Sequence, residues 1–248
     1  MNDWMYYWAA VSAVFLLAGV IKGVIGLGLP TVSMALLALW MPPAQAAALL
    51  IVPSLITNLW QTGPRASFGA VLRRIGGMQV GIVVGTLGGA LWLGVPAGAW
   101  ASVALGVALV LYAGWGLTGR QLHVSEAHAR WMGPLVGALT GLVTAVTGVF
   151  VVPAVPYLQA LGFQRDSLIQ AMGISFTTST VVLAIGLAGN GSYPMSAVGG
   201  SLAMLVPAIG GMVLGTWLRR RLSVAVFRRC FLIGLALLGL YMAVRALA

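Results

Sequence analysis

Acidic residues are almost absent from this 248-residue sequence, which contains only Asp3, Glu126 and Asp166. Its two histidines, His123 and His128, lie close together between two apolar segments. Charged residues make up 6% of the chain, against roughly a quarter in soluble domains. No paired carboxylates, nucleophile–base set or metal-ligand spacing falls inside an apolar segment. The sequence therefore predicts no catalytic residue, no metal site, no cofactor and no enzyme activity.

Cysteine is also scarce, since Cys230 is the only one. A single thiol excludes an internal disulfide framework and a thiolate metal site. The first residues, MNDWMYYWAAVSAVF, lack a basic region and a small-residue cleavage site. We therefore expect them to begin the first membrane span and not a removable signal peptide.

Apolar residues make up 60% of the chain, and the mean hydropathy is +1.03. With about 20 residues per span, there is room for roughly eight to ten membrane segments and no soluble domain. The sequence predicts an all-α polytopic transmembrane helical bundle. Two segments, 28–41 and 150–162, are too short to cross about 30 Å of hydrocarbon as helices, and whether they cross or re-enter stays open. The apolar segments are 5–26, 28–41, 44–62, 75–94, 98–118, 132–149, 150–162, 167–188, 196–218 and 228–247.

Positive charge gathers in a few loops and gives a net charge of +10. Arginine-rich loops of inner-membrane proteins stay in the cytoplasm, so these charges are interpreted as determinants of membrane topology. We therefore expect no nucleic acid partner. Attraction of anions to a pore mouth is the alternative use of these charges. The uncharged loops 94–98 and 189–195 should lie outside, and both termini should be periplasmic. The loops expected in the cytoplasm are 63–74 with Arg65, Arg73 and Arg74, 119–131 with Arg120 and Arg130, and 219–229 with Arg219, Arg220, Arg221, Arg228 and Arg229.

The two halves of the chain share glycine patterns in the same order. Gly19-x3-Gly23 recurs as Gly137-x3-Gly141, and GIVVGTLG at 81–88 recurs as GMVLGTWL at 211–218. Equivalent loops differ in charge and should face opposite sides, which is typical of inverted-topology repeats. Such repeats need an odd number of crossings, either three full spans with a short broken-helix hairpin or five segments counted singly. We predict repeats at 1–118 and 132–248, joined by a cytoplasmic linker at 119–131.

Residues 17–30, LAGVIKGVIGLGLP, place Lys22 and four glycines inside an apolar run. A charge at membrane depth is costly and suggests function, and glycine-rich breaks can direct helix N-termini and free N–H groups at an anion. A lysine that extends its side chain to the interface is the alternative. Because no carboxylate lies at that depth, a cationic substrate would lack a counter-charge. A small anionic substrate fits better.

Uncharged polar residues occur at similar depth in both halves, where hydrogen bonding between helices is the alternative to ligand binding. Prolines inside the apolar runs, such as Pro53, leave backbone carbonyls without a helical donor. These carbonyls could bind a ligand, or the proline could be a kink whose carbonyl is paired by neighbouring groups. The candidate substrate-binding residues are Lys22, Gly23, Gly26, Gly28, Asn58, Gln61, Thr144, Thr147, Ser175, Thr178 and Ser179.

Several of these segments together resemble the TauE/SafE family of small bacterial sulfite exporters and sulfonate permeases. The resemblance covers nearly the whole chain and rests on GVIKGVIGLG at 19–28, VPSLITNLWQ at 52–61, Gly137-x3-Gly141 followed by Val152 and Pro153, and the paired G-x3-G-T segments. The second break, TAVTG at 144–148, departs from the glycine cluster usual in the family. The resemblance implies transport of sulfite, sulfonates or other small anions across the cytoplasmic membrane, often outward.

We therefore expect a secondary transporter that works by alternating access of two repeats around Lys22. Its expected partners are a small anion and the lipid bilayer, and assembly into a homo-oligomer stays open. A passive, channel-like anion conduit and a non-transporting membrane scaffold are the alternatives. A scaffold would fill the middle of the membrane with apolar packing, whereas a transporter needs a polar cavity.

Overall fold

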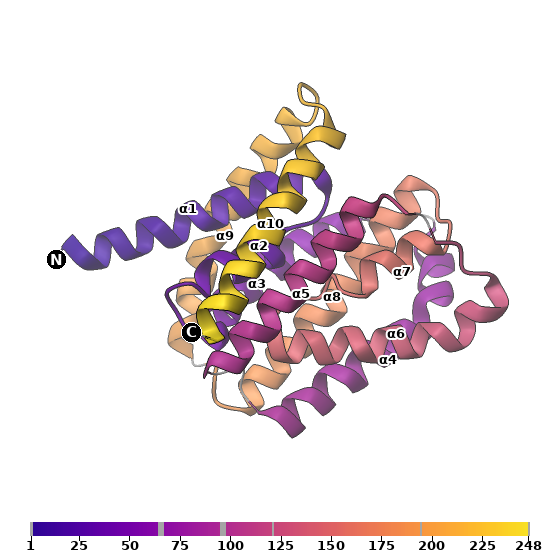
Figure 1. The fold of residues 1–248 in the computed structure, drawn as a ribbon, viewed down its shortest axis with the longest axis horizontal. Helices are drawn as coiled ribbons and strands as arrows, with labels where there is room; N and C mark the ends of the chain where they lie inside the picture. Colours follow the sequence, from indigo (N-terminus) through magenta and orange to yellow (C-terminus); the bar gives the residue numbers. More distant parts are fainter. Residues whose placement is uncertain (1, 64–66, 95–97, 121, 194, 248) are drawn as a thin grey trace.

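The computed structural model describes residues 2–63, 67–94, 98–120, 122–193 and 195–247, and these form ten helices and no strand (Figure 1). Eight helices are long and apolar enough to cross a membrane. The predicted all-α polytopic bundle is confirmed. Parts of the loops used above to assign orientation, namely Arg65, residues 95–97, Gln121 and Pro194, lie outside the described residues. The helices are α1 Asn2–Ile25, α2 Leu29–Leu37, α3 Pro43–Thr62, α4 Phe68–Leu93, α5 Gly98–Thr118, α6 Glu126–Thr147, α7 Ala154–Ala160, α8 Arg165–Gly189, α9 Met195–Leu218 and α10 Val224–Leu247.

The short helix α2 returns the chain along the length of α1. The Gln45 amide at the start of α3 donates to the Tyr7 hydroxyl near the start of α1, at 3.4 Å. At the other end of both helices, Lys22 Nζ donates to Thr57 Oγ1 at 3.1 Å. Helices α1 and α3 are therefore parallel, and residues 26–42 must run back between their ends. A nine-residue helix covers about 14 Å, and the residues that flank α2 supply the remaining length.

Helix α7 does the same in the second half of the chain. Val124 N, just before α6, donates to Ala160 O at 2.9 Å, and Tyr157 Oη donates to Ala129 O at 3.0 Å. The end of α7 thus meets the start of α6. Each half contains a hairpin with one long and one short arm, followed by three long helices. Each half thus has five segments, an odd number, as the sequence predicts. The hairpin differs from the prediction because its first arm, α1 or α6, is long enough to span a membrane, whereas its second arm is short.

Equivalent helices of the two halves lie antiparallel to each other. In the α3–α8 pair, Ser54 contacts Thr180, whereas Thr62, later in α3, accepts a hydrogen bond from Gln170, earlier in α8. Helices α5 and α10 pack with Gly106 beside Gly239. Further along α5, Gly116 faces Leu232, which comes earlier in α10. An axis perpendicular to the helices relates such copies, as in an inverted repeat.

The repeated glycines form two equivalent interfaces between the halves. Helix α1 packs on α9 and α4 packs on α6 so closely that a Cβ added at these glycines would overlap a backbone carbonyl of the facing helix. Small residues permit this approach, and close packing drives association where lipid offers no hydrophobic gain. Each contact has its counterpart in the other interface. The facing pairs are Gly19 with Ala208, Gly23 with Met212, Gly137 with Met78, Gly141 with Ile82, Gly211 with Leu16, Gly215 with Val20, Gly81 with Pro134 and Gly85 with Ala138.

Pro53 breaks the hydrogen-bond ladder of α3, and a serine of α9 repairs it. A proline has no N–H, so the carbonyl four residues earlier loses its helical donor. That carbonyl belongs to Leu49, and Ser201 Oγ donates to it at 2.9 Å. The same oxygen of Ser201 accepts from Val52 N at 3.0 Å. For this proline, repair by a neighbouring helix is the observed arrangement.

We predict that Ser201→Ala destabilises the protein and that Pro53→Ala reduces the penalty. Loss of the hydroxyl leaves the buried Leu49 carbonyl without its donor, which costs about 1–3 kcal/mol. In the Pro53→Ala variant, the restored backbone N–H of α3 can reach that carbonyl instead. The measurement is the thermal midpoint in detergent of both single variants and the double variant. Additive effects would contradict the repair.

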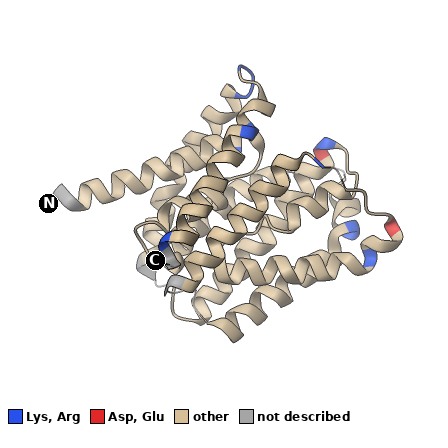
Figure 2. Ribbon diagram, in the orientation of Figure 1, with Lys and Arg blue, Asp and Glu red and all other residues tan. Residues whose placement is uncertain are grey.

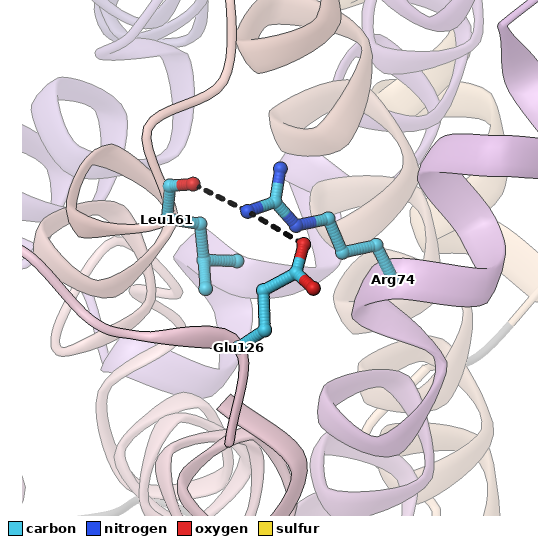
Figure 3. Close-up of polar contacts among 3 residues, drawn as sticks. All are labelled: Arg74, Glu126 and Leu161. Atoms are coloured by element: carbon cyan, nitrogen blue, oxygen red, sulfur yellow. Dashed lines mark hydrogen bonds and ion pairs between the residues drawn. The ribbon is translucent and has the colours of Figure 1, made fainter. Parts of the chain in front are cut away.

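Charged residues lie at helix ends and in loops, which leaves the middles of the helices uncharged in the view of Figure 2. Arg74 joins three segments at one end of the bundle (Figure 3). Its Nη2 donates to Leu161 O at 2.8 Å and lies 4.0 Å from the Glu126 carboxylate. Its guanidinium also covers the Phe163 ring. The starts of α4 and α6 and the end of α7 are thereby placed together.

Candidate functional site

The break after α1 opens the backbone beside Lys22. Gly26 and Gly28 have φ values of 82° and 119°, which glycine adopts without strain. Pro30 then starts α2 at a position where its missing N–H costs nothing. The Gly26 carbonyl accepts a hydrogen bond from Gln61 Nε2 at 3.2 Å. The break therefore turns a backbone oxygen toward α3.

Lys22 is buried, with 4% of its surface exposed. Its ammonium donates to Thr57 Oγ1 at 3.1 Å and to Asn58 Oδ1. Asn58 is itself fixed, because its amide donates to Ser54 Oγ at 3.0 Å and to Thr180 Oγ1 at 3.3 Å. The partners of Lys22 among the described residues are thus uncharged. An ammonium has three donors, so one is left for a ligand.

A cavity of about 670 Å³ lies against Lys22, within the usual size range of small-molecule sites. Its polar lining consists of Lys22, Thr57, Gln61, Thr216, Arg219 and Arg220. Its apolar wall includes Trp60, Ile169, Met212 and Trp217. The wall therefore combines the end of α1, the end of α3, the start of α8 and the end of α9. Among the described residues, three positive side chains and no acidic side chain line it, which favours an anion.

The structure brings part of the predicted set together. Lys22, Gly23, Gly26 and Gln61 line the cavity, and Asn58 holds Lys22 from behind. The N–H groups of the glycines are not free as expected, since Gly26 N donates to Lys22 O at 2.7 Å and Gly23 lies within α1. Gly23 instead permits contact with α9. Glycine here makes space and a turn, and the side chains supply the donors.

The other predicted residues lie outside this cavity lining. Asn58 is one of them, although it contacts Lys22 directly. Gly28 precedes α2 beside Ile21 and Phe231. The rest are on α6 and α8. Three threonine hydroxyls donate within their own helix: Thr144 to Thr140 O, Thr147 to Val143 O and Thr178 to Ile174 O. Ser175 accepts a hydrogen bond from Gln79, and the Ser179 hydroxyl is buried without a partner among the described residues.

The prediction missed Ser54. Thr57 and Thr180 belong to the polar residues expected at similar depth in the two halves, but they and the two arginines were not among the candidate binding residues. Ser54 and Asn58 are four residues apart and share a helix face, so this spacing was a usable signal. Arg219 and Arg220 were interpreted first as residues that set membrane topology. Attraction of anions to a pore mouth was the alternative, and it is the one that fits their place in the cavity lining. Thr180 ends the polar run 175–180 that the sequence places in α8, and it contacts Asn58 because α8 packs against α3.

Helices of spanning length define a multi-pass membrane protein, and a basic, partly polar cavity lies at the ends of four of them. The model of the family described as "Sulfite exporter TauE/SafE" matches residues 11–242, and the chain belongs to this family. No curated protein and no solved structure gave a match. The family is one of membrane transporters for sulfite and related sulfur anions, in agreement with the expectation that the protein is not an enzyme.

Proposed function

We propose that this protein is a secondary transporter that exports a small sulfur-containing or organic anion, such as sulfite or a sulfonate. The observation that carries the proposal is a buried lysine with uncharged partners on the wall of a cavity. A buried cation without a counter-ion is costly, and an anion in the cavity would supply that counter-ion. Family membership supports the same substrate class.

Anion selectivity would come from the order of the positive groups along the cavity. Arg219 and Arg220 follow the end of α9 and provide charge at its rim, where it raises the local anion concentration. Lys22 then acts at the deeper wall with a directed N–H donor, whereas the Gln61 amide nitrogen already donates to Gly26 O and Ile169 O. Trp60 and Trp217 supply an apolar boundary that favours a compact ligand.

The proposed mechanism is alternating access, with the repeats 1–118 and 132–248 moving against each other around the site. The antiparallel α3–α8 contact supports this, because polar groups from both halves meet there. By the charge of its loops the protein would lie in the inner membrane with both termini periplasmic. The cavity, rimmed by the arginines after α9, would then open to the cytoplasm. The 119–131 linker would lie on that same side.

The two alternative functions make different demands on the cavity. A scaffold requires apolar packing at that depth, and the basic lining argues against it. A passive conduit could have the same lining. A conduit lets its anion equilibrate and cannot concentrate it, whereas a carrier exchanges bound anions across the membrane.

Counterflow in proteoliposomes distinguishes the carrier from the conduit. Vesicles preloaded with unlabelled sulfite should transiently accumulate traces of external ³⁵S-sulfite above the equilibrium level, because exit and entry share one alternating site. Thiosulfate and sulfoacetate are tested in the same way, with protein-free vesicles as the control. Simple equilibration would identify a conduit, and uptake equal to that of protein-free vesicles with all three anions would contradict transport.

A further inference from the structure

The cavity beside Lys22 has a closed counterpart in the other half of the molecule. Because Gly19, Gly23, Gly211 and Gly215 have equivalent contacts at Gly137, Gly141, Gly81 and Gly85, the cavity residues of α1 and α9 can be matched one by one. Lys22, just before Gly23, corresponds to Thr140. Thr216, just after Gly215, corresponds to Thr86. Thr140 and Thr86 are both fully buried, whereas Thr216 is exposed to the cavity.

Helices α4 and α8 lie parallel around this closed region. Gln79 Nε2 donates to Ser175 Oγ at 2.9 Å, and further along both helices Asn190 donates to Ala90 O. Ser179 is one turn beyond Ser175 on the same face of α8, and Thr86 is two turns beyond Gln79 on the same face of α4. Gln79 and Ser175 thus contact each other, and Thr86 and Ser179 continue these two helix faces as a row of polar side chains.

Three atoms in this row lack the hydrogen bonds that buried polar groups normally have. The Thr86 hydroxyl, the Ser179 hydroxyl and Gln79 Oε1 are buried without a partner among the described residues. All three side chains are at least nine-tenths buried. A buried hydroxyl without a partner costs free energy, and an apolar residue of similar size would pack there at no such cost. The Thr86 and Ser179 hydroxyls would gain a partner in a second state that binds a ligand there.

We propose that Gln79, Thr86 and Ser179 line the outward-facing half of the anion path, which is closed in this structure and opens when the Lys22 cavity closes. The inference rests on the proposed function, since it gives that transporter its second half-site. The Thr86 and Ser179 hydroxyls would donate hydrogen bonds to the oxygens of a small sulfur oxyanion, and Gln79, whose amide nitrogen already donates to Ser175 Oγ, would border the path. The absence of a cation among the described residues of this row makes binding weaker than at Lys22, so an exported anion is released there.

Removal of the hydroxyls should slow transport without destabilising the protein. In Thr86→Val and Ser179→Ala, we expect sulfite counterflow to fall about tenfold, the lower end of the range for loss of one hydrogen bond to a charged group. The thermal midpoint should stay equal or rise, because each hydroxyl lacks a partner among the described residues in the closed form. The control is Thr177→Val on α8, whose hydroxyl is satisfied by Gly173 O. Parental counterflow in both variants, or equal losses of stability and transport, would overturn the proposal.

Accessibility to a thiol reagent provides a second measurement. In a Cys230→Ser background, which removes the exposed native thiol, Ser179→Cys should react with an impermeant, negatively charged thiol reagent. We expect the reaction to accelerate when sulfite is being transported, because only the open half-site admits the reagent. Equal and slow labelling with and without sulfite would overturn the proposal.

The proposed function and this inference fail in different ways. Absence of counterflow in the parent protein contradicts the transporter itself. Parental counterflow that depends on Lys22 but is unaffected in Thr86→Val and Ser179→Ala preserves the transporter and removes only the second half-site.

Discussion

Sulfite counterflow should fall about tenfold to a hundredfold in Lys22→Met, the range for loss of a hydrogen bond to a charged group. Methionine retains an unbranched chain of similar size but has no charge and no donor. Lys22 is the only residue of the described cavity lining that is both cationic and buried. The substitution therefore removes the deep binding group and leaves Arg219 and Arg220 at the rim.

The Lys22→Arg variant should retain only part of the sulfite counterflow of the parent protein. Its charge is kept, but its planar guanidinium does not fit a position shaped for the point-like ammonium that Thr57 and Asn58 hold. The Arg229→Met variant is a suitable control, because it removes one positive charge from an exposed residue of α10 that does not line the cavity.

Counterflow is measured together with the stabilisation of each variant by sulfite, since a bound anion raises the thermal midpoint. Lys22→Met should lose both transport and stabilisation, and Arg229→Met should keep both. Unchanged affinity and rate in Lys22→Met would remove this lysine from the mechanism.

Gly85→Ala should lower the thermal midpoint in detergent strongly, whereas Gly88→Ala on the same helix should leave it equal or raise it. An added Cβ at Gly85 overlaps the backbone carbonyl of Ala138, and at Gly88 it meets nothing within 4 Å. Overpacking costs about 1–3 kcal/mol or more when backbone must move. An alanine without a clash gains up to about 1 kcal/mol in helix propensity.

The same comparison applies to the equivalent interface. Gly215→Ala overlaps the Val20 carbonyl, and Gly210→Ala meets open space. If the two interfaces are equivalent, Gly215→Ala should destabilise about as much as Gly85→Ala. Equal midpoints for Gly85→Ala and Gly88→Ala would contradict the close helix approach.

The fold could be predicted to the extent that local patterns encode it. Long apolar runs indicate spanning helices, and the paired glycine patterns indicate a duplication, because each signal lies within one segment. The pattern around Lys22 also identified the break correctly, since glycines at positive φ separate α1 from α2. The paths of α2 and α7 could not be predicted, because length alone does not say whether a short segment returns.

The site was less predictable than the fold. Polarity and depth selected Lys22 and Asn58, which the structure brings together, and they selected Thr144 and Thr147 equally, whose hydroxyls donate within α6. A threonine in a membrane helix has both uses. Only its neighbours on other helices distinguish them.

By itself, the sequence determined that the chain is a helical membrane protein whose halves share glycine patterns, with one lysine at a glycine-rich break and only three acidic residues. These properties depend on composition and on residues near each other in the chain. Tertiary structure decided that α1 packs on α9 and α4 on α6, that Lys22 is held by α3 beside a cavity, and that Thr86 and Ser179 are buried. Those contacts join residues far apart in sequence, and they depend on how closely glycine faces from different halves approach each other.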